Sequence, residues 1–303
     1  MHDYITLRIS RTMIDGNTAA TDGGGMCIYN TSLTFDDVTI SNNSSTRGGG
    51  VFIAASGEPV MNRTIVAHNS ASDHGGGIVF VNNYSTLRLN NSVVSSNSAG
   101  KDGGGVYLDG TASLALNNST VSDNTAADHG GGIYNPGGVT SNNSTIHTNM
   151  AAYGGGVYNY STAWMTANNS TFSGNQASYF GGGFFNLKTL TLNYSTVANN
   201  TADSDGDSGG DGGGIYNLSA VNMKSSLVAG NKKGASGVTD PMADCGNSGG
   251  TIVSQGYNMT GAGTGCSLGG AGDVTVDPAS VFASVIGPLA DNGHGFLKVA
   301  KRG

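Results

Sequence analysis

The chain has 303 residues, 51 of them glycine, with only 11% charged residues and a formal net charge of −7. The negative charge argues against nucleic acid as a partner, and no apolar run is long enough for a membrane span. A chain so rich in glycine and so poor in charge would be typical of disorder, unless its apolar residues recurred regularly.

They do recur, within a repeated motif whose clearest copy is Asn117-Asn118-Ser119-Thr120-Val121-Ser122-Asp123-Asn124 followed by Gly130-Gly131-Gly132-Ile133-Tyr134-Asn135. Successive closing asparagines lie 25 to 31 residues apart. They are Asn17, Asn43, Asn69, Asn97, Asn124, Asn149, Asn175, Asn200 and Asn231. Triple glycines begin at Gly23, Gly48, Gly75, Gly103, Gly130, Gly154, Gly181 and Gly212. Such a period predicts a solenoid in which each repeat is one coil.

Apolar residues form columns when the repeats are aligned on the closing asparagine. Two columns lie two residues apart, as in Leu114 and Leu116, a third lies three residues before the asparagine, as in Val121, and a fourth follows the triple glycine, as in Ile133. Spacing of two predicts strands rather than helices, about three in each coil. Because like residues recur once per coil, we predict an all-β fold, a right-handed single-stranded parallel β-helix of about nine coils with an irregular C-terminal cap.

In chain order, residues 1–235 are predicted to form the β-helix repeats and residues 236–303 a final partial coil and cap. The first coil is already in register at Leu7 and Ile9, and no secretion leader precedes it in this sequence. The closing asparagines are expected to form an internal ladder of side-chain amides. In the cap, 274–276 and 296–299 are the expected strands.

The repeats resemble those of bacterial surface β-helix proteins of the polymorphic outer-membrane-protein type. The tail, with Asp244-Cys245, Gly256-Tyr257-Asn258, Cys266-Ser267-Leu268 and the segment Gly287 to Gly293, resembles the end of proteins with a choice-of-anchor Q domain. The resemblance implies an extracellular or cell-surface β-helix and supplies no catalytic residues. We therefore expect a secreted protein.

The largest insertion, between Asn200 and Gly212, is acidic. It contains Asp203, Asp205, Asp207 and Asp211 on a Gly/Ser-rich loop. Carboxylates at alternate positions of a short loop are suited to a hard cation such as Ca²⁺. The alternative is a solvated acidic loop without a ligand.

The three cysteines differ in their setting. Cys245 and Cys266 flank a glycine-rich loop in the tail, and a disulfide there would close about 22 residues and stabilise by roughly 3 kcal/mol; two reduced thiols are the alternative. Cys27 stands at a coil position and is expected to be a small buried or half-buried residue.

Other polar and aromatic residues allow two readings. Asn-x-Ser/Thr sequons arise largely from the repeat itself, and exposed ones could be glycosylated: Asn30, Asn83, Asn118, Asn143, Asn169, Asn193 and Asn217. His74 and His129, two coils apart, are interpreted as turn residues. The aromatic column Phe52, Tyr107, Tyr134, Tyr158, Phe185 and Tyr216 should face outward, where it either contacts sugars or stacks between coils.

These observations favour a non-enzymatic extracellular structural protein, a β-helical rod that self-assembles head to tail into a surface filament. A homopolymer of this kind would form through strand edges at the coil ends. One alternative is an adhesin or carbohydrate-binding surface module. Another is an enzyme resembling polysaccharide lyases or hydrolases, although no cluster of carboxylates with a Lys or Arg base stands out in the sequence.

Overall fold

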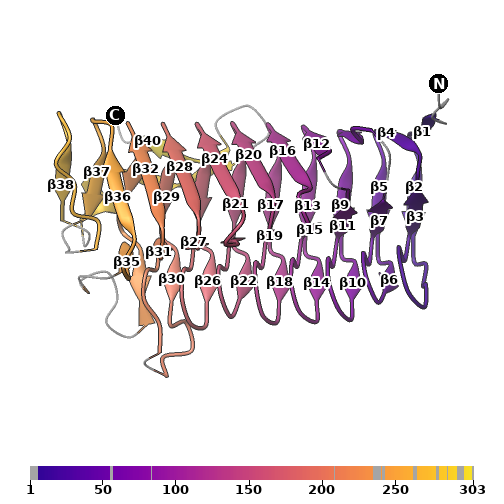
Figure 1. Cartoon of the computed structure of the whole chain (residues 1–303), viewed down its shortest axis with the longest axis horizontal. Helices are drawn as coiled ribbons and strands as arrows, with labels where there is room; N and C mark the ends of the chain where they lie inside the picture. The colour runs from indigo at the N-terminus through magenta and orange to yellow at the C-terminus, as the bar shows by residue number, and fades with distance from the viewer. Residues whose placement is uncertain are drawn as a thin grey trace.

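The computed structural model describes residues 6–54, 57–82, 84–207, 209–234, 240, 243–261, 265–277, 280–284, 286–291 and 297–301. In this part, the chain winds into a rod of stacked coils, with the earliest and latest coils at opposite ends (Figure 1). Strands of successive coils pair in parallel and in register, for example Leu87 with Leu114 and Leu114 with Val139. The predicted parallel β-helix of about nine coils is confirmed.

Four parallel sheets run along the rod. The ten-stranded sheet contains β1 (Thr6–Ser10), β4 (Ser32–Asp36), β8 (Val60–Asn62), β12 (Thr86–Asn90), β16 (Ser113–Asn117), β20 (Gly138–Asn142), β24 (Trp164–Asn168), β28 (Thr189–Asn193), β32 (Ala220–Lys224) and β36 (Thr251–Ser254). The eleven-stranded sheet contains β2 (Met13–Asp15), β5 (Thr39–Ser41), β9 (Ile65–Ala67), β13 (Val93–Ser95), β17 (Thr120–Ser122), β21 (Thr145–His147), β25 (Thr171–Ser173), β29 (Thr196–Ala198), β33 (Leu227–Val228), β37 (Met259–Gly261) and β38 (Val274–Val276).

The other two sheets are built from the segments around the triple glycines. The eight-stranded sheet contains β6 (Ser44–Ser45), β10 (Ser70–Ala71), β14 (Ser98–Ala99), β18 (Thr125–Ala126), β22 (Met150–Ala151), β26 (Gln176–Ala177), β30 (Thr201–Ala202) and β34 (Lys232–Lys233). The nine-stranded sheet contains β3 (Met26–Tyr29), β7 (Val51–Ala54), β11 (Ile78–Val81), β15 (Val106–Asp109), β19 (Ile133–Asn135), β23 (Val157–Asn159), β27 (Phe184–Asn186), β31 (Ile215–Asn217) and β35 (Cys245–Asn247).

A complete coil therefore has four strands, and the expectation of about three was wrong. The additional strand consists of the two residues after the closing asparagine, such as β18. Two residues are too few to show an alternating pattern, so the strand left no periodic signal in the sequence.

The apolar columns fill the interior of the rod. Leu114, Leu116, Val121 and Ile133 are buried within one continuous hydrophobic cluster that includes the equivalent residues of the other coils. Triple glycines border this core for steric reasons. Gly130 has a φ of +64°, and a Cβ at Gly132 would lie 2.6 Å from the Gly156 carbonyl oxygen and 3.1 Å from the Asn149 amide.

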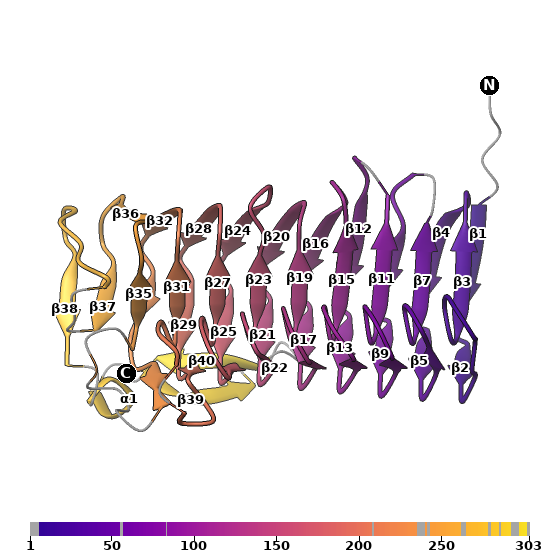
Figure 2. The same ribbon diagram turned by 60° about the horizontal axis from the view of Figure 1, so that its bottom comes forward.

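The tail continues three of the four sheets through β35, β36 and β37 and adds β38 beside β37. The strand expected at 274–276 is confirmed as β38. The strand expected at 296–299 corresponds to β40 (Leu297–Lys301) from residue 297 onward, and Phe296 lies outside the described residues. The short helix α1 (Val281–Ser284) places Val281 in a small cluster with Leu227 of β33. With the antiparallel hairpin β39 (Ile286–Asp291)–β40, α1 lies beside the coils rather than across the end of the rod (Figure 2).

In the described part of the chain, no helix has the length and apolar character needed to cross a membrane.

Candidate functional site

The nine closing asparagines form one hydrogen-bonded ladder inside the rod. The main-chain N–H and the Nδ2 of each donate to the Oδ1 of the next, at 2.8–3.0 Å, up to Asn231. The Nδ2 of Asn124 also donates to the carbonyl of Val94 in the preceding coil. Every member beyond Asn17 is buried. Because each buried amide has partners in the coils on both sides, the ladder ties the stack together.

The ladder ends on a carboxylate. Asn231 donates from its main-chain N–H and its Nδ2 to Oδ1 of Asp244, at 2.9 and 2.8 Å. Asp244 directly precedes Cys245, the partner of Ile215, and so stands where earlier coils have their third glycine. All the amides direct their donors toward Asp244, so the carboxylate lies at the positive end of a line of aligned dipoles.

Burial raises the pKa of Asp244 to about 6, although the two hydrogen bonds from Asn231 act in the opposite direction. Since the unfolded pKa is lower, the folded protein holds this proton more tightly. The stabilisation is complete below about pH 4 and is lost as the pH rises through about 6. Asp244→Asn keeps the Oδ1 acceptor without the charge.

We therefore expect Asp244→Asn to raise the free energy of unfolding at pH 7 by about 2–3 kcal/mol and to have little effect at pH 4. Urea unfolding at both pH values checks this, with Asp109→Asn as an exposed control. Equal pH dependence in the wild type and Asp244→Asn would contradict it.

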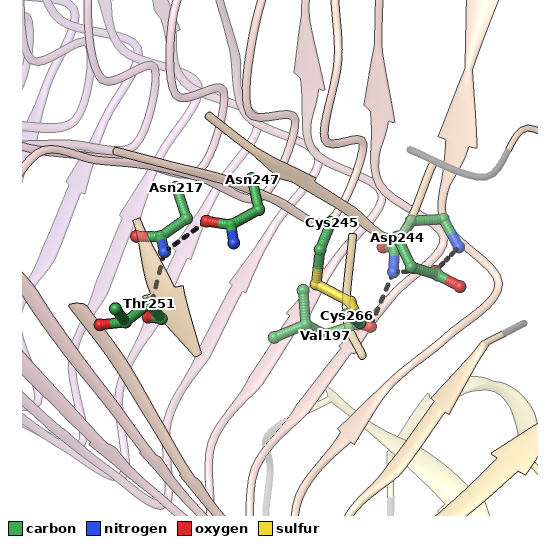
Figure 3. The surroundings of a disulfide bond; sticks show 8 residues. Val197, Asn217, Asp244, Cys245, Asn247, Thr251 and Cys266 are labelled. Atoms are coloured by element: carbon green, nitrogen blue, oxygen red, sulfur yellow. Dashed lines mark hydrogen bonds between the residues drawn. A yellow bond between two sulfur atoms is a disulfide. The ribbon is translucent and has the colours of Figure 1, made fainter. Parts of the chain in front are cut away.

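The predicted partners Cys245 and Cys266 are joined by a disulfide, with their Cα atoms 5.2 Å apart. Both are buried in the hydrophobic cluster that the inner columns form. Figure 3 shows the bond next to Asp244 and close to Val197. The cross-link therefore covers the core where the ladder ends.

Cys27 differs from the expectation of a buried or half-buried residue, because its side chain is exposed. It pairs with Phe52 in the register of β3 and β7, and thus occupies the outward-facing column. Strand alternation places Cys27 on the outer face of its sheet, which overturns the expectation of a small buried or half-buried residue.

A second internal ladder was missed. Asn135, Asn159, Asn186 and Asn217 are fully buried, and each donates from Nδ2 to Oδ1 of the next, with Asn247 as the last acceptor. Figure 3 shows its last pair, Asn217 and Asn247. The signal was present, because an asparagine closes the Ile-Tyr-Asn or equivalent segment after each later triple glycine.

Serines build a third line of contacts. The main-chain N–H of each donates to Oγ of the next, from Ser92 through Ser119, Ser144, Ser170 and Ser195 to Ser226. Ser226 donates to Asn258, and Asn258 donates to Asp273. This line also ends on a carboxylate. The serine of the repeated Asn-Ser pair was visible in the sequence, but its inward direction was not.

A fourth ladder lies on the outer face of the ten-stranded sheet and runs in the opposite direction. Each Nδ2 donates to the Oδ1 of the preceding coil, along Asn193, Asn168, Asn142, Asn117, Asn90 and Asn62, and the last acceptor is Asp36. These side chains are half-buried.

The aromatic column stacks between coils. The Tyr107 and Tyr134 rings lie 5.0 Å apart at 6°, Tyr134 and Tyr158 follow at 5.6 Å, and Tyr158 and Phe185 at 5.0 Å. Burial raises the pKa of Tyr107 and of Tyr158 to about 12. Of the two readings offered by the sequence, stacking between coils agrees with these contacts.

His74 and His129 come together on one carboxylate. Asp102, in the coil between them, has its oxygens 3.3 Å from Nδ1 of His74 and 2.7 Å from Nδ1 of His129. Burial alone would raise the pKa of Asp102, but hydrogen bonds from His129 and His74 hold it at about 2. His74 stacks on Tyr107 at 4.5 Å, so the trio extends the aromatic stack.

Three of the four predicted calcium ligands lie together. One carboxylate oxygen from each of Asp203, Asp205 and Asp207 lies within 4.8 Å of the others. Asp203 is buried, and the other two are exposed. Asp211 instead bonds to Nζ of Lys233 at 2.6 Å, so the sequence pattern grouped it wrongly with the other three.

Calcium binding by this loop stays a prediction. Isothermal titration calorimetry with CaCl₂ should show binding by the wild type that is absent from an Asp205→Ala, Asp207→Ala double variant, because each carboxylate supplies oxygen ligands. Asp211→Ala is the matched control and should retain binding. Heat signals that are the same in the wild type and the double variant, or absent from both, would remove the site.

The sequons differ in accessibility. Asn30, Asn143 and Asn169 are exposed and Asn118 and Asn193 half-buried, whereas Asn83 lies outside the described residues. Asn217 must be corrected: it is fully buried in the second ladder, where its Nδ2 donates to Asn247 and Thr251. An amide nitrogen engaged in this way is inaccessible for glycosylation in the folded protein.

Comparison with known families agrees with this geometry. Residues 2–121 match the family described as right handed beta helix region, and residues 118–136 match the Chlamydia polymorphic membrane protein repeat. Neither the curated proteins nor the solved structures gave a match. The resemblance of the tail to choice-of-anchor Q proteins stays a prediction. The chain is thus a right-handed β-helix, one segment of which is similar to the polymorphic membrane protein repeat.

Proposed function

We propose that the chain is a non-enzymatic extracellular structural protein, a β-helical rod displayed at a cell surface. One observation supports this most directly: the polar side chains that recur most regularly form hydrogen bonds between successive coils. The ladder from Asn17 to Asn231 and Asp244 uses one amide per coil for this purpose, and every amide beyond Asn17 is buried. A hydrogen-bond network of this kind makes the rod rigid, and the amides in it are unavailable for binding or catalysis.

The non-enzymatic part of the proposal rests on the acid–base groups that lie closest together. His74 and His129 both face Asp102. The imidazole of His74 stacks on Tyr107 of the aromatic column, and that of His129 packs at a tilt against Tyr158. Groups held in this way contribute to packing along the rod. A catalytic base would instead need to face a substrate position.

The surface location rests on two supports. The first is the match of residues 118–136 to a repeat whose family is described as a membrane protein. The disulfide between Cys245 and Cys266 is of a kind that persists in oxidising, extracellular environments.

Electron microscopy of the purified protein, combined with a polysaccharide-cleavage assay, tests the proposal. We expect straight rods and no release of reducing ends from pectic, glucan or chitin substrates. Cleavage that is lost in Asp102→Asn would overturn the non-enzymatic role and favour the enzyme alternative.

Head-to-tail assembly is the finer part of the proposal. Strands β1, β2 and β3 are the outermost members of their sheets among the described residues. An outermost strand leaves main-chain groups for a further strand, which comes either from additional residues of this chain or from a second copy. We propose the second copy, with the tail as the partner surface.

Arg8 provides a specific test. By register, Arg8 pairs with Thr34, Thr34 with Val60 and Val60 with Arg88. The N–H of Arg88 donates backward to the carbonyl of Pro59, so the equivalent N–H of Arg8 faces the open edge. Arg8→Pro removes that donor, whereas Arg8→Ala removes only the side chain and its ion pair with Asp36.

Electron microscopy should show filaments for the wild type and for Arg8→Ala, and short or no filaments for Arg8→Pro with its β content unchanged by circular dichroism. A wild type that stays monomeric at high concentration, or filaments joined through lateral faces, would contradict head-to-tail assembly.

A further inference from the structure

The outer face of the ten-stranded sheet contains a hollow across strands β12, β16, β20 and β24. Its volume is about 230 Å³. Arg88 of β12 and Trp164 of β24 lie at its two ends, and the small side chains Ser113 and Ala115 of β16 lie between them. The volume of the hollow is smaller than the ~300–1,000 Å³ of pockets for drug-sized ligands, and it suits one ring-sized unit of a longer molecule.

The indole of Trp164 lies over a glycine. Gly138 pairs with Trp164 in the register of β20 and β24, and a Cβ at Gly138 would overlap the indole ring, with Nε1 at 2.8 Å. The glycine thus allows the ring to lie along the sheet toward the hollow. Trp164 is 46% exposed, so part of this ring is available to a ligand.

Asn117 and Asn142, which also line the hollow, belong to the fourth ladder, but the other polar groups around it take no part in the ladders. Among the described residues, the hydroxyls of Thr86, Ser113 and Thr140 have no hydrogen-bond partner, unlike the serines of the internal line. Arg88 is 40% exposed in its side chain and uses Nε and Nη2 on Glu58, at 3.2 and 2.7 Å. The Nη1 of Arg88 remains available to a ligand, and both Arg88 and Glu58 can form hydrogen bonds with a ligand at the edge of the hollow.

We propose that this hollow binds a pyranose ring of an oligosaccharide or polysaccharide. A pyranose presents an apolar C–H face, which packs on the exposed indole, and a rim of hydroxyls, which pair with the free hydroxyls and the guanidinium. The site lies away from the stacked aromatic column, whose rings are largely covered by one another. It adds a binding activity to the rod and does not depend on the proposed assembly, so either can fail without the other.

The full 303-residue chain should be applied to an array of immobilised hexasaccharides covering neutral glucans, mannans and chitin fragments and acidic galacturonate fragments. The hexasaccharide with the strongest signal is then used in isothermal titration calorimetry. We expect Trp164→Ala to weaken its affinity by about tenfold or more, as truncation of an aromatic anchor commonly does.

Gly138→Ala supplies a second variant, because the added Cβ displaces the indole without removing it. It should also weaken binding, while circular dichroism and the unfolding midpoint stay close to those of the wild type, since the displaced atoms belong to a surface side chain. Tyr194→Ala, which removes a 59% exposed aromatic ring elsewhere on the rod, is the control and should bind as the wild type does.

Array signals for neutral but not acidic hexasaccharides, or the reverse, would identify the class of sugar, and their weakening in Trp164→Ala would support the site. An array without any signal would overturn the proposal. Binding that persists in both Trp164→Ala and Gly138→Ala would show that sugars bind elsewhere and would overturn it as well.

Discussion

Replacing Val121 by Asp should lower the free energy of unfolding by about 4 kcal/mol or more. Val121 is fully buried in β17, between Val94 and Ile146 of the neighbouring coils. The carboxylate would enter an interior lined by apolar side chains and would remain either unpaired or protonated at a cost. Urea or thermal unfolding followed by circular dichroism measures the change.

Thr120→Asp is the matched control, because residue 120 precedes Val121 in the same strand and faces outward with a half-buried side chain. It should change the unfolding free energy by no more than about 0.5–1 kcal/mol. A Val121→Asp protein within about 0.5 kcal/mol of the wild type would be incompatible with the inward direction of this column.

The second large effect is expected for Asn124→Ala, at about 3–5 kcal/mol. The change removes the Oδ1 that accepts two hydrogen bonds from Asn97 and the Nδ2 that donates to Asn149 and Val94. The groups left behind are buried, and a buried polar group without a partner costs more than the bond itself contributed. Calorimetric or urea unfolding provides the measurement.

Asn117→Ala separates the effect of burial from that of losing an amide. Asn117 lies in the same coil, in the half-buried outer ladder, where water can replace its bonds to Asn90 and Asn142. Its loss should cost about 1 kcal/mol or less. If Asn117→Ala were as destabilising as Asn124→Ala, burial would not be the reason for the strength of the inner ladder.

The repeat was readable from the sequence because a coil places equivalent residues on top of one another. The columns of Leu114, Val121 and Ile133 therefore predicted both the fold and the direction of the side chains. The closing asparagines were assigned to a ladder for the same reason. Periodicity could not reveal Asp244 as the last acceptor of the ladder. It follows Asn231 by only 13 residues instead of the usual 25 to 31, and its side chain is a carboxylate rather than an amide.

Contacts between unlike residues were harder to anticipate. His74, Asp102 and His129 each precede a triple glycine, so their common column was visible. Each residue nevertheless differs in type from its neighbour in the column, and the pairing of two imidazoles with one carboxylate depends on complementary rather than similar side chains. The contact of Trp164 with Gly138 required the register of β20 against β24, which the sequence alone did not supply.

The internal ladder has a consequence for how such a chain can change in evolution. Its bonds join only consecutive coils, and neighbouring members offer the same donors and the same acceptor. Loss of the segment from Ser98 through Asn124 would connect Asn97 to Thr125 and place Asn97 next to Asn149 in the ladder. No amide donor or acceptor of the ladder would then lack a partner. Recombination between the similar Asn-Asn-Ser copies could therefore lengthen or shorten the rod by whole coils. The length of the rod would then vary in discrete steps, each the height of one coil.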